Sequence, residues 1–334
     1  MSSEKAADAV TRQRTLPGRD RETMTREALS MAALRDYDIT FILVSGGTDS
    51  LVAADAVLRW GDEYGIVPDA VCHINTGVGL AVTRRTVQRF CADRGVAYIE
   101  GANWTDGEML AHRVLKHGWP ARGSARPGAA GGHQMEFVNR KERVLDGVYR
   151  SWGGDHLWIS GVRAAESDRR AGNVGDAPVA FGATGGRKPR QSWLCPCHGW
   201  SGEQKRTHIE EFDIPETPAY DFVGHSGECV ACSFDHPTAL NEIRMVDPEL
   251  AYALSFLCNW VYQRIRTGEI DIPLHRCVWG WPRRLEQTDD ERDDDDDDGD
   301  TAARQRTLSM IGCEDCSVED CYVRGGDDFW PSRP

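Results

Sequence analysis

Short apolar runs alternate with segments of helical spacing over the first half of the chain. Residues 39–44 form a β-branched and aromatic run that predicts a buried strand, and residues 51–59 then carry apolar side chains at helical spacing. The alternation continues, with strands expected at 70–74, 96–100 and 156–160 and helices at 82–90 and 140–152. This order predicts an α/β fold, in which a parallel, twisted sheet is covered by helices on both faces.

Glycine-bearing turns follow three of the expected strands, at 45–50, 75–79 and 160–163. Ligands of parallel sheets bind at the carboxyl ends of the strands, where such turns gather. The pattern therefore predicts one binding site that these turns build together.

The second half of the chain changes character several times. Residues 172–190 are glycine-rich and basic and predict a mobile loop, and residues 237–272 have helical spacing. An acidic run over 289–300 precedes a cysteine-rich segment, and such a run cannot pack into a core. We expect the following organisation: a polar, flexible N-terminus (1–27), an α/β domain (28–236), a helical extension (237–285), an acidic linker (286–305) and a cysteine-rich tail (306–334).

Charge is concentrated in one place. Residues 286–300 hold 11 acids and one base, for −10, so the other 42 acids and 38 bases leave only −4 of the total of −14. The mildly acidic body argues against nonspecific nucleic-acid binding. The run at 39–44 is far shorter than the ~20 residues that cross a bilayer, and no secretory signal is evident. We therefore expect a cytoplasmic protein that does not use a membrane.

The turn after the first strand has features that predict a phosphate-binding site. It consists of Ser45, Gly46, Gly47, Thr48, Asp49 and Ser50. Adjacent glycines let the backbone present its N–H groups, and the following helix adds partial positive charge at its N-terminus. A glycine-rich turn with a Ser/Asp helix cap is the plainer alternative. Neither a Walker A loop nor a G-x-G-x-x-G fingerprint occurs in the chain.

Ser-Gly-Gly-x-Asp-Ser after a strand resembles the pyrophosphate (PP) loop of ATP pyrophosphatases and phosphoadenosine phosphosulfate (PAPS) reductases. Further segments match that superfamily in order, over roughly residues 37–285: 73–79, 139–143, 161–170, 214–221 and 226–229. The resemblance implies the adenine nucleotide alpha-hydrolase-like fold and an adenine nucleotide as ligand, either PAPS, adenosine phosphosulfate (APS) or ATP. Beyond the loop, it implies ligand contacts from Thr76, Gly77, Arg163, Glu166, Ser167 and Arg170.

The chain departs from the reductases in its cysteines. The Glu-Cys-Gly-x-His tail of PAPS reductases and the Cys-Cys pair of cluster-binding APS reductases are both absent. Eleven cysteines without a secretory signal favour metal ligation or thiol chemistry over disulfides. Two C-x-x-C pairs complete a four-thiolate site for zinc or a [4Fe-4S] cluster. The favoured set is Cys229, Cys232, Cys313 and Cys316, with Cys195 and Cys197 as substitutes. Reduced core thiols and a redox dithiol are the alternatives.

Three functions follow as hypotheses. The first is a sulfonucleotide reductase, whose nucleophile would be Cys313, Cys316 or Cys321 and whose reductant would be a thioredoxin-like partner. The second is an ATP pyrophosphatase-type enzyme that uses Mg²⁺ and adenylylates a substrate in a sulfur-insertion pathway, with DNA or tRNA as partner. The third is a non-enzymatic nucleotide- or metal-binding module. The sequence leaves open whether the chain forms a homo-oligomer.

Overall fold

The computed structural model describes residues 19–102, 110–119, 138–166, 177–182, 190–230 and 239–279. The chain forms two compact units, of which unit 1 comprises Met1–Ala102 with Arg140–Glu228, and unit 2 comprises Asn103–Asn139 with Cys229–Pro334. This division differs from the expected one, in which residues 103–139 belong to the α/β domain and the helical extension begins at 237.

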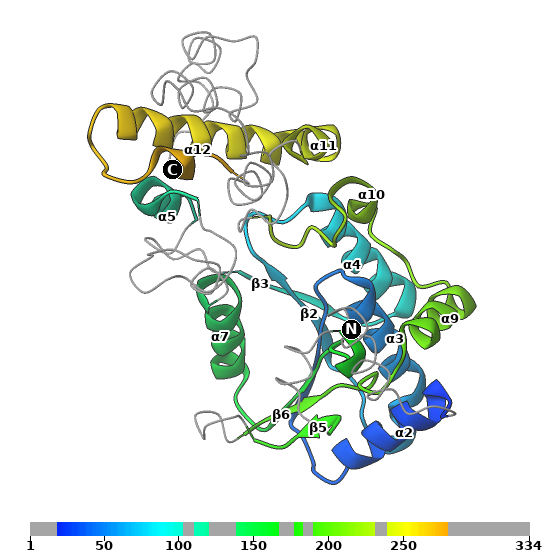
Figure 1. The fold of residues 1–334 in the computed structure, drawn as a ribbon. Coiled ribbons are helices and arrows are strands. Elements are labelled where there is room, and N and C mark those ends of the chain that lie inside the picture. Colours follow the sequence, from blue (N-terminus) through cyan, green and yellow to red (C-terminus); the bar gives the residue numbers. More distant parts are fainter. Residues whose placement is uncertain are drawn as a thin grey trace, which may run out of the picture. The chain divides into compact units, whose positions relative to one another are not determined.

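Unit 1 is built on a six-stranded sheet with the order β3-β2-β1-β4-β6-β5 (Figure 1). The pairs β3–β2, β2–β1, β1–β4 and β4–β6 are parallel, and only the short β5 runs antiparallel, to β6. The α/β fold with a mostly parallel sheet, predicted from the alternation of strands and helices, is thus confirmed. The strands are β1 (Ile39–Leu43), β2 (Ala70–Asn75), β3 (Tyr98–Ala102), β4 (His156–Ile159), β5 (Val179–Ala180) and β6 (Gln191–Leu194). β5 lies within the stretch expected to be a mobile loop.

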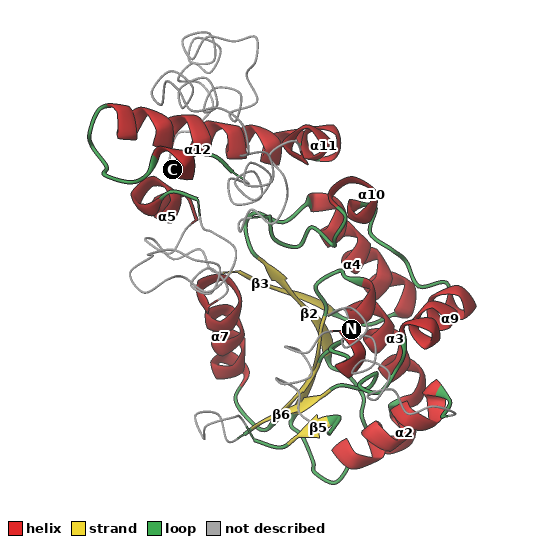
Figure 2. Ribbon diagram, in the orientation of Figure 1, coloured by secondary structure: helices red, strands yellow, loops and turns green. Residues whose placement is uncertain are grey.

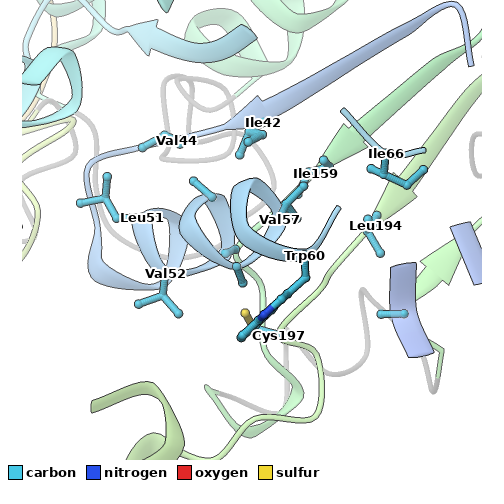
Figure 3. Packing of buried hydrophobic residues seen from close by; sticks show 14 of the residues in the cluster. Ile42, Val44, Leu51, Val52, Val57, Trp60, Ile66, Ile159, Leu194 and Cys197 are labelled. Carbon is cyan, nitrogen blue, oxygen red and sulfur yellow. The ribbon is translucent and has the colours of Figure 1, made fainter. Parts of the chain in front are cut away.

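Helices cover both faces of this sheet, as Figure 2 shows. On one face Phe41 and Trp158 pack with α7, and on the other the strands pack against α3. Around α3, Ile42, Ile159 and Leu194 form a common core with the apolar side of the helix (Figure 3). The helices are α2 (Arg21–Ala32), α3 (Thr48–Trp60), α4 (Ala81–Arg94), α7 (Arg143–Trp152), α9 (Gly202–Phe212) and α10 (Ala219–Val223). The short helical segments are η1 (Asp62–Tyr64) and η3 (Ala164–Glu166) of unit 1, and η2 (Val138–Glu142, of π type), whose first two residues are assigned to unit 2.

The N-terminal segment requires a correction. Residues 21–27, expected to be part of a flexible N-terminus, form the first half of α2. Met24, Ala28 and Leu29 are buried in the main core at helical spacing, and Asp20 caps the helix by accepting from Thr23 N–H at 2.9 Å. Three apolar positions among many charged residues were too sparse a pattern to reveal this helix.

Unit 2 is helical in its described part. Its elements are α5 (Leu110–His117), α11 (Ala239–Val246), α12 (Pro248–Arg266) and η5 (Leu274–Cys277). The helical spacing predicted over 237–272 is confirmed but broken at Asp247, whose side chain accepts from Leu250 N–H at 3.1 Å and caps α12. Trp119, just after α5, donates from Nε1 to Cys258 Sγ of α12 at 3.2 Å, which explains why α5 belongs with this unit. Among the described helices, none is both long and apolar enough to cross a membrane.

Candidate phosphate-binding site

The predicted phosphate loop lies where the strand order of the sheet reverses. From β1 the chain moves to β2 on one side and later returns to β4 on the other side, so β1 and β4 are neighbours. The loop 45–50 follows the carboxyl end of β1, and Gly161 follows the carboxyl end of β4. Open α/β sheets bind their ligands at such reversal points.

Gly161 allows the two strand ends to approach closely. A Cβ atom on this residue would lie 2.5 Å from the carbonyl oxygen of Asp49 and 2.6 Å from Cα of Ser50. Real Cβ atoms do not come this close to a backbone, so only glycine lets the first turn of α3 rest on the end of β4. The turns at 45–50 and 160–163, which the sequence pattern places at strand ends, therefore lie against each other.

The loop is shaped by hydrogen bonds among its own residues. Ser50 Oγ donates to the Gly47 carbonyl at 2.7 Å and accepts from Ser45 N–H at 3.3 Å. Gly47 N–H donates to Ser45 Oγ at 3.3 Å, and Gly46 adopts a positive φ of 85° that favours glycine. A Cβ on Gly46 would also lie 2.4 Å from the Thr83 methyl group, so α4 closes directly over this glycine.

Two backbone amides of the loop remain available. Within the described residues, neither Gly46 N–H nor Asp49 N–H donates to a protein acceptor, and Gly47 provides α3 with no side-chain cap. Thr48 N–H has only the Tyr220 hydroxyl, at the long distance of 3.5 Å. The first amides of a helix have no intrahelical acceptor, so an uncapped N-terminus leaves them for an anion. The Ser/Asp helix cap is therefore not what these residues form.

Two cations converge on Asp49, the acidic residue of the loop. Arg163 donates from Nε to Asp49 Oδ1, and Lys205 Nζ lies 3.4 Å from Asp49 Oδ2 and 3.2 Å from Thr48 Oγ1. Arg163 also donates from Nη1 to the Trp200 carbonyl at 3.3 Å, and its side chain is only 7% exposed. These three charged groups sum to +1, to which the N-terminus of α3 adds about half a charge.

Thr76 and Gly77 occupy the end of β2, next to β1, as predicted. Gly77 has a positive φ of 76° and its N–H donates to Asn75 Oδ1 at 2.8 Å. Thr76 is buried, and its hydroxyl donates to the Glu228 carbonyl at 2.8 Å while its own carbonyl accepts from Arg140. Because its hydroxyl proton is donated to the Glu228 carbonyl, Thr76 has fewer groups available for a ligand than the sequence suggested. Its ligand contact stays a prediction.

The described cysteines of unit 1 are buried thiols. Burial raises the pKa of Cys72 and Cys195 to about 12 and that of Cys91 to about 11, and raises the pKa of Cys197 well above its usual value. Cys197 belongs to the apolar core beside α3 (Figure 3). The neutral thiol is the stable form at each of these positions, and a neutral thiol is a weak nucleophile.

The four-thiolate site stays a prediction. Cys229 is half-buried, and Cys232, Cys313 and Cys316 lie outside the described residues, as do Cys321, Ser167, Arg170 and the side chain of Glu166. In the described part of the chain, no three His, Cys, Asp or Glu side chains gather as they would around a metal ion.

Two residues at the loop were missed by the sequence analysis, namely Lys205 of α9 and Tyr220 of α10. Tyr220 falls inside a segment that resembles the superfamily, so this signal was present. Lys205 falls outside every such segment, and no local pattern marks it.

The solved structures that are similar to this chain include the following two. One is a PAPS reductase from Candida auris in complex with phosphate, at 15% identity and a TM-score of 0.41, covering 66% of this chain and 92% of the reductase. The other is the U34-tRNA thiolase NcsA from Methanococcus maripaludis with its [4Fe-4S] cluster, at 13% identity and a TM-score of 0.41, covering 75% of this chain and 78% of the thiolase. No protein-family model and no curated protein sequence matches the chain.

Proposed function

We propose that unit 1 binds the phosphate-bearing end of an adenine nucleotide at the loop 45–50. The observation that carries the proposal is the pair of available amides, Gly46 N–H and Asp49 N–H, at an uncapped helix N-terminus. Arg163 and Lys205 make the local charge positive although the body of the protein is acidic. Backbone donors and cations together favour a polyanion over a neutral ligand.

The adenine part of the proposal rests on the ordered resemblance to the PP-loop superfamily. The segment 73–79 runs to the carboxyl end of β2, the described residues 161–166 follow the carboxyl end of β4, and Tyr220 of 214–221 lies 3.5 Å from Thr48 N of the loop. PAPS, APS and ATP share an adenosine 5′-phosphate, so each of them presents the same anionic group to the loop.

For the reaction, we propose sulfur transfer by reduction of a sulfonucleotide. A cysteine thiolate forms a bond to the sulfonate sulfur, and the nucleotide phosphate leaves with the electron pair of the broken S–O bond. A thioredoxin-like dithiol then releases sulfite from the resulting S-sulfocysteine and is itself oxidised to a disulfide. Cations at the loop stabilise the leaving phosphate. The nucleophile would be Cys313, Cys316 or Cys321.

One observation favours the second candidate, an ATP pyrophosphatase-type activator. All four described cysteines of unit 1 are buried with raised pKa values, so this unit offers no thiolate in its described part. Adenylylation of a substrate, with release of pyrophosphate from ATP, needs none. In the described part of the loop, Arg163 and Lys205 contact the two carboxylate oxygens of Asp49, so a Mg²⁺ ion bound to Asp49 would have to displace Lys205.

Calorimetric titration with ATP, APS and PAPS tests the binding site, with adenosine as the ligand that lacks phosphate. We expect the three nucleotides to bind and adenosine to bind much more weakly. Gly46→Ala should weaken nucleotide binding, because it strains a positive φ and meets Thr83, whereas Gly65→Ala has a similar φ of 69° with open space around it. Equal nucleotide affinity in both variants and the unaltered protein would show that the loop 45–50 does not bind the nucleotide.

Turnover assays separate the reactions. Release of labelled sulfite from PAPS or APS, lost in one of the variants Cys313→Ser, Cys316→Ser or Cys321→Ser, supports the reductase. Release of pyrophosphate from ATP without sulfite supports the activator, and a nucleic-acid substrate should then accept sulfur. Binding without any turnover would contradict both and leave a non-enzymatic module.

A further inference from the structure

One face of α9 points at α3 through two polar side chains. His208 Nε2 lies 2.9 Å from Asp55 Oδ2, and Lys205 Nζ reaches Thr48 and Asp49 one turn nearer the loop. Residues three apart on a helix are neighbours on its surface, so both contacts come from the same side of α9.

The His208 contact fixes how α9 lies on α3. Asp55 is only 1% exposed and also accepts from Arg59 at 2.5 Å and from Arg94 at 2.9 Å. His208 is fully buried, with its ring packed against Trp200 and Phe212. This buried network sets the register between the two helices at a distance from the loop. The position of Lys205 beside Thr48 is therefore set by the packing of the core and not by the surface contact alone.

Lys205 and Arg163 hold Asp49 differently. Arg163 is nearly buried and bonds both Asp49 and a backbone carbonyl, as a structural ion pair does. Lys205 is 21% exposed, and its contacts of 3.2 and 3.4 Å are longer than the about 2.7–2.9 Å of a charge-assisted hydrogen bond. An ammonium group has three donors, and at these distances neither oxygen holds it firmly.

The loop itself, Ser-Gly-Gly-Thr-Asp-Ser, contains no cation. Since Arg163 already neutralises Asp49, Lys205 supplies the excess positive charge. We propose that Lys205 binds a phosphate or sulfate oxygen of the ligand and turns away from Thr48 and Asp49 to do so. This inference rests on the proposed function and names a ligand-binding residue that comes from a helix far along the chain.

Titration of the full-length protein with ATP, APS, inorganic pyrophosphate and adenosine tests the assignment. For Lys205→Met we expect binding of all three anions to weaken about 10- to 100-fold, the range of one charge-assisted hydrogen bond, while adenosine binding is unchanged. Lys205→Arg should keep most of the affinity. Arg206→Met removes the neighbouring, exposed cation of α9 and should change the affinity less than about twofold. Because Lys205→Met removes a positive charge from the site, anion binding to this variant should also depend less on salt concentration.

Each outcome decides one question. If Gly46→Ala weakens the binding of ATP and Lys205→Met does not, Lys205 is a structural partner of Asp49, and the inference fails while the site stands. Equal losses for adenosine and the anions in Lys205→Met also overturn it, because they indicate a general disturbance of α9. If the unaltered protein binds neither nucleotides nor pyrophosphate, the proposed function itself fails. Thermal unfolding of each variant reports whether it is folded.

Discussion

Substitution of Gly161 by alanine tests the close contact between the two strand ends that build the site. The added methyl group would lie 2.5 Å from the Asp49 carbonyl oxygen and 2.6 Å from Cα of Ser50. Both contacts are with backbone, so the first turn of α3 must move as a whole. Overpacking of this kind costs about 1–3 kcal/mol of the free energy of unfolding. In a domain of about 150–250 residues, each kcal/mol lowers the unfolding temperature by roughly 2–4 °C.

The same displacement should weaken nucleotide binding, because the Asp49 amide and carboxylate move with the helix. We expect the dissociation constant for ATP or PAPS to rise at least about tenfold, which corresponds to ~1.4 kcal/mol. Calorimetric titration gives the affinity, and urea unfolding of the same samples gives the stability.

Gly147→Ala is the matched control for this experiment. Gly147 lies within α7, where a Cβ atom would meet nothing within 4 Å. Alanine is the better helix former by up to about 1 kcal/mol, so this variant should be slightly more stable and bind nucleotide normally. If Gly161→Ala unfolds and binds as the unaltered protein does, the close approach of β4 to the loop does not shape the site, and our reasoning is wrong.

Three further predictions concern the loop, the buried network and the thiols. Gly46→Ala should cost about 1–3 kcal/mol more than Gly65→Ala in urea unfolding, since both residues have a positive φ but only Gly46 has a close neighbour. Burial works against ionisation of Asp55, but hydrogen bonds from His208 and two arginines outweigh it and lower the pKa, so Asp55→Asn should cost about 3 kcal/mol at neutral pH. Because this pKa is lowered, the difference between Asp55→Asn and the unaltered protein should shrink as the pH falls below about 4; a difference independent of pH would contradict the ion pairing. Burial raises the pKa of Cys197, so its thiol should resist iodoacetamide at pH 8 until urea unfolds the protein, as mass spectrometry can follow. The same raised pKa means that stability should fall as the pH rises above about 9, where the unfolded thiol ionises; rapid alkylation of Cys197 in the folded protein would refute its burial.

The local features of unit 1 followed from the sequence because they depend on short-range rules. A β-branched run, a pair of glycines and a helical apolar pattern within 39–59 predicted β1, the loop and α3 in the right order. The strands expected to end at 74 and 160 end at 75 and 159, because turn residues punctuate the apolar runs. The position of the loop at the carboxyl edge of the sheet followed from the parallel arrangement of the strands alone.

Contacts between distant segments could not be predicted in this way. Lys205 reaches Thr48 across 157 residues, and it does so because β4 lies next to β1 and α9 packs on α3 through Asp55. Helix α5 belongs to unit 2, where Trp119 donates to Cys258 of α12, although it is the first described element after β3 in the chain.

The sequence by itself therefore determined the glycine-rich turn after β1 and the kind of sheet that carries it. Only the tertiary structure decided that α3 is uncapped by side chains, that Gly161 must be glycine, and that the excess positive charge comes from α9. The physical reason is that periodicity and turn chemistry act over a few residues, whereas strand order and helix packing are set by which apolar surfaces exclude water together.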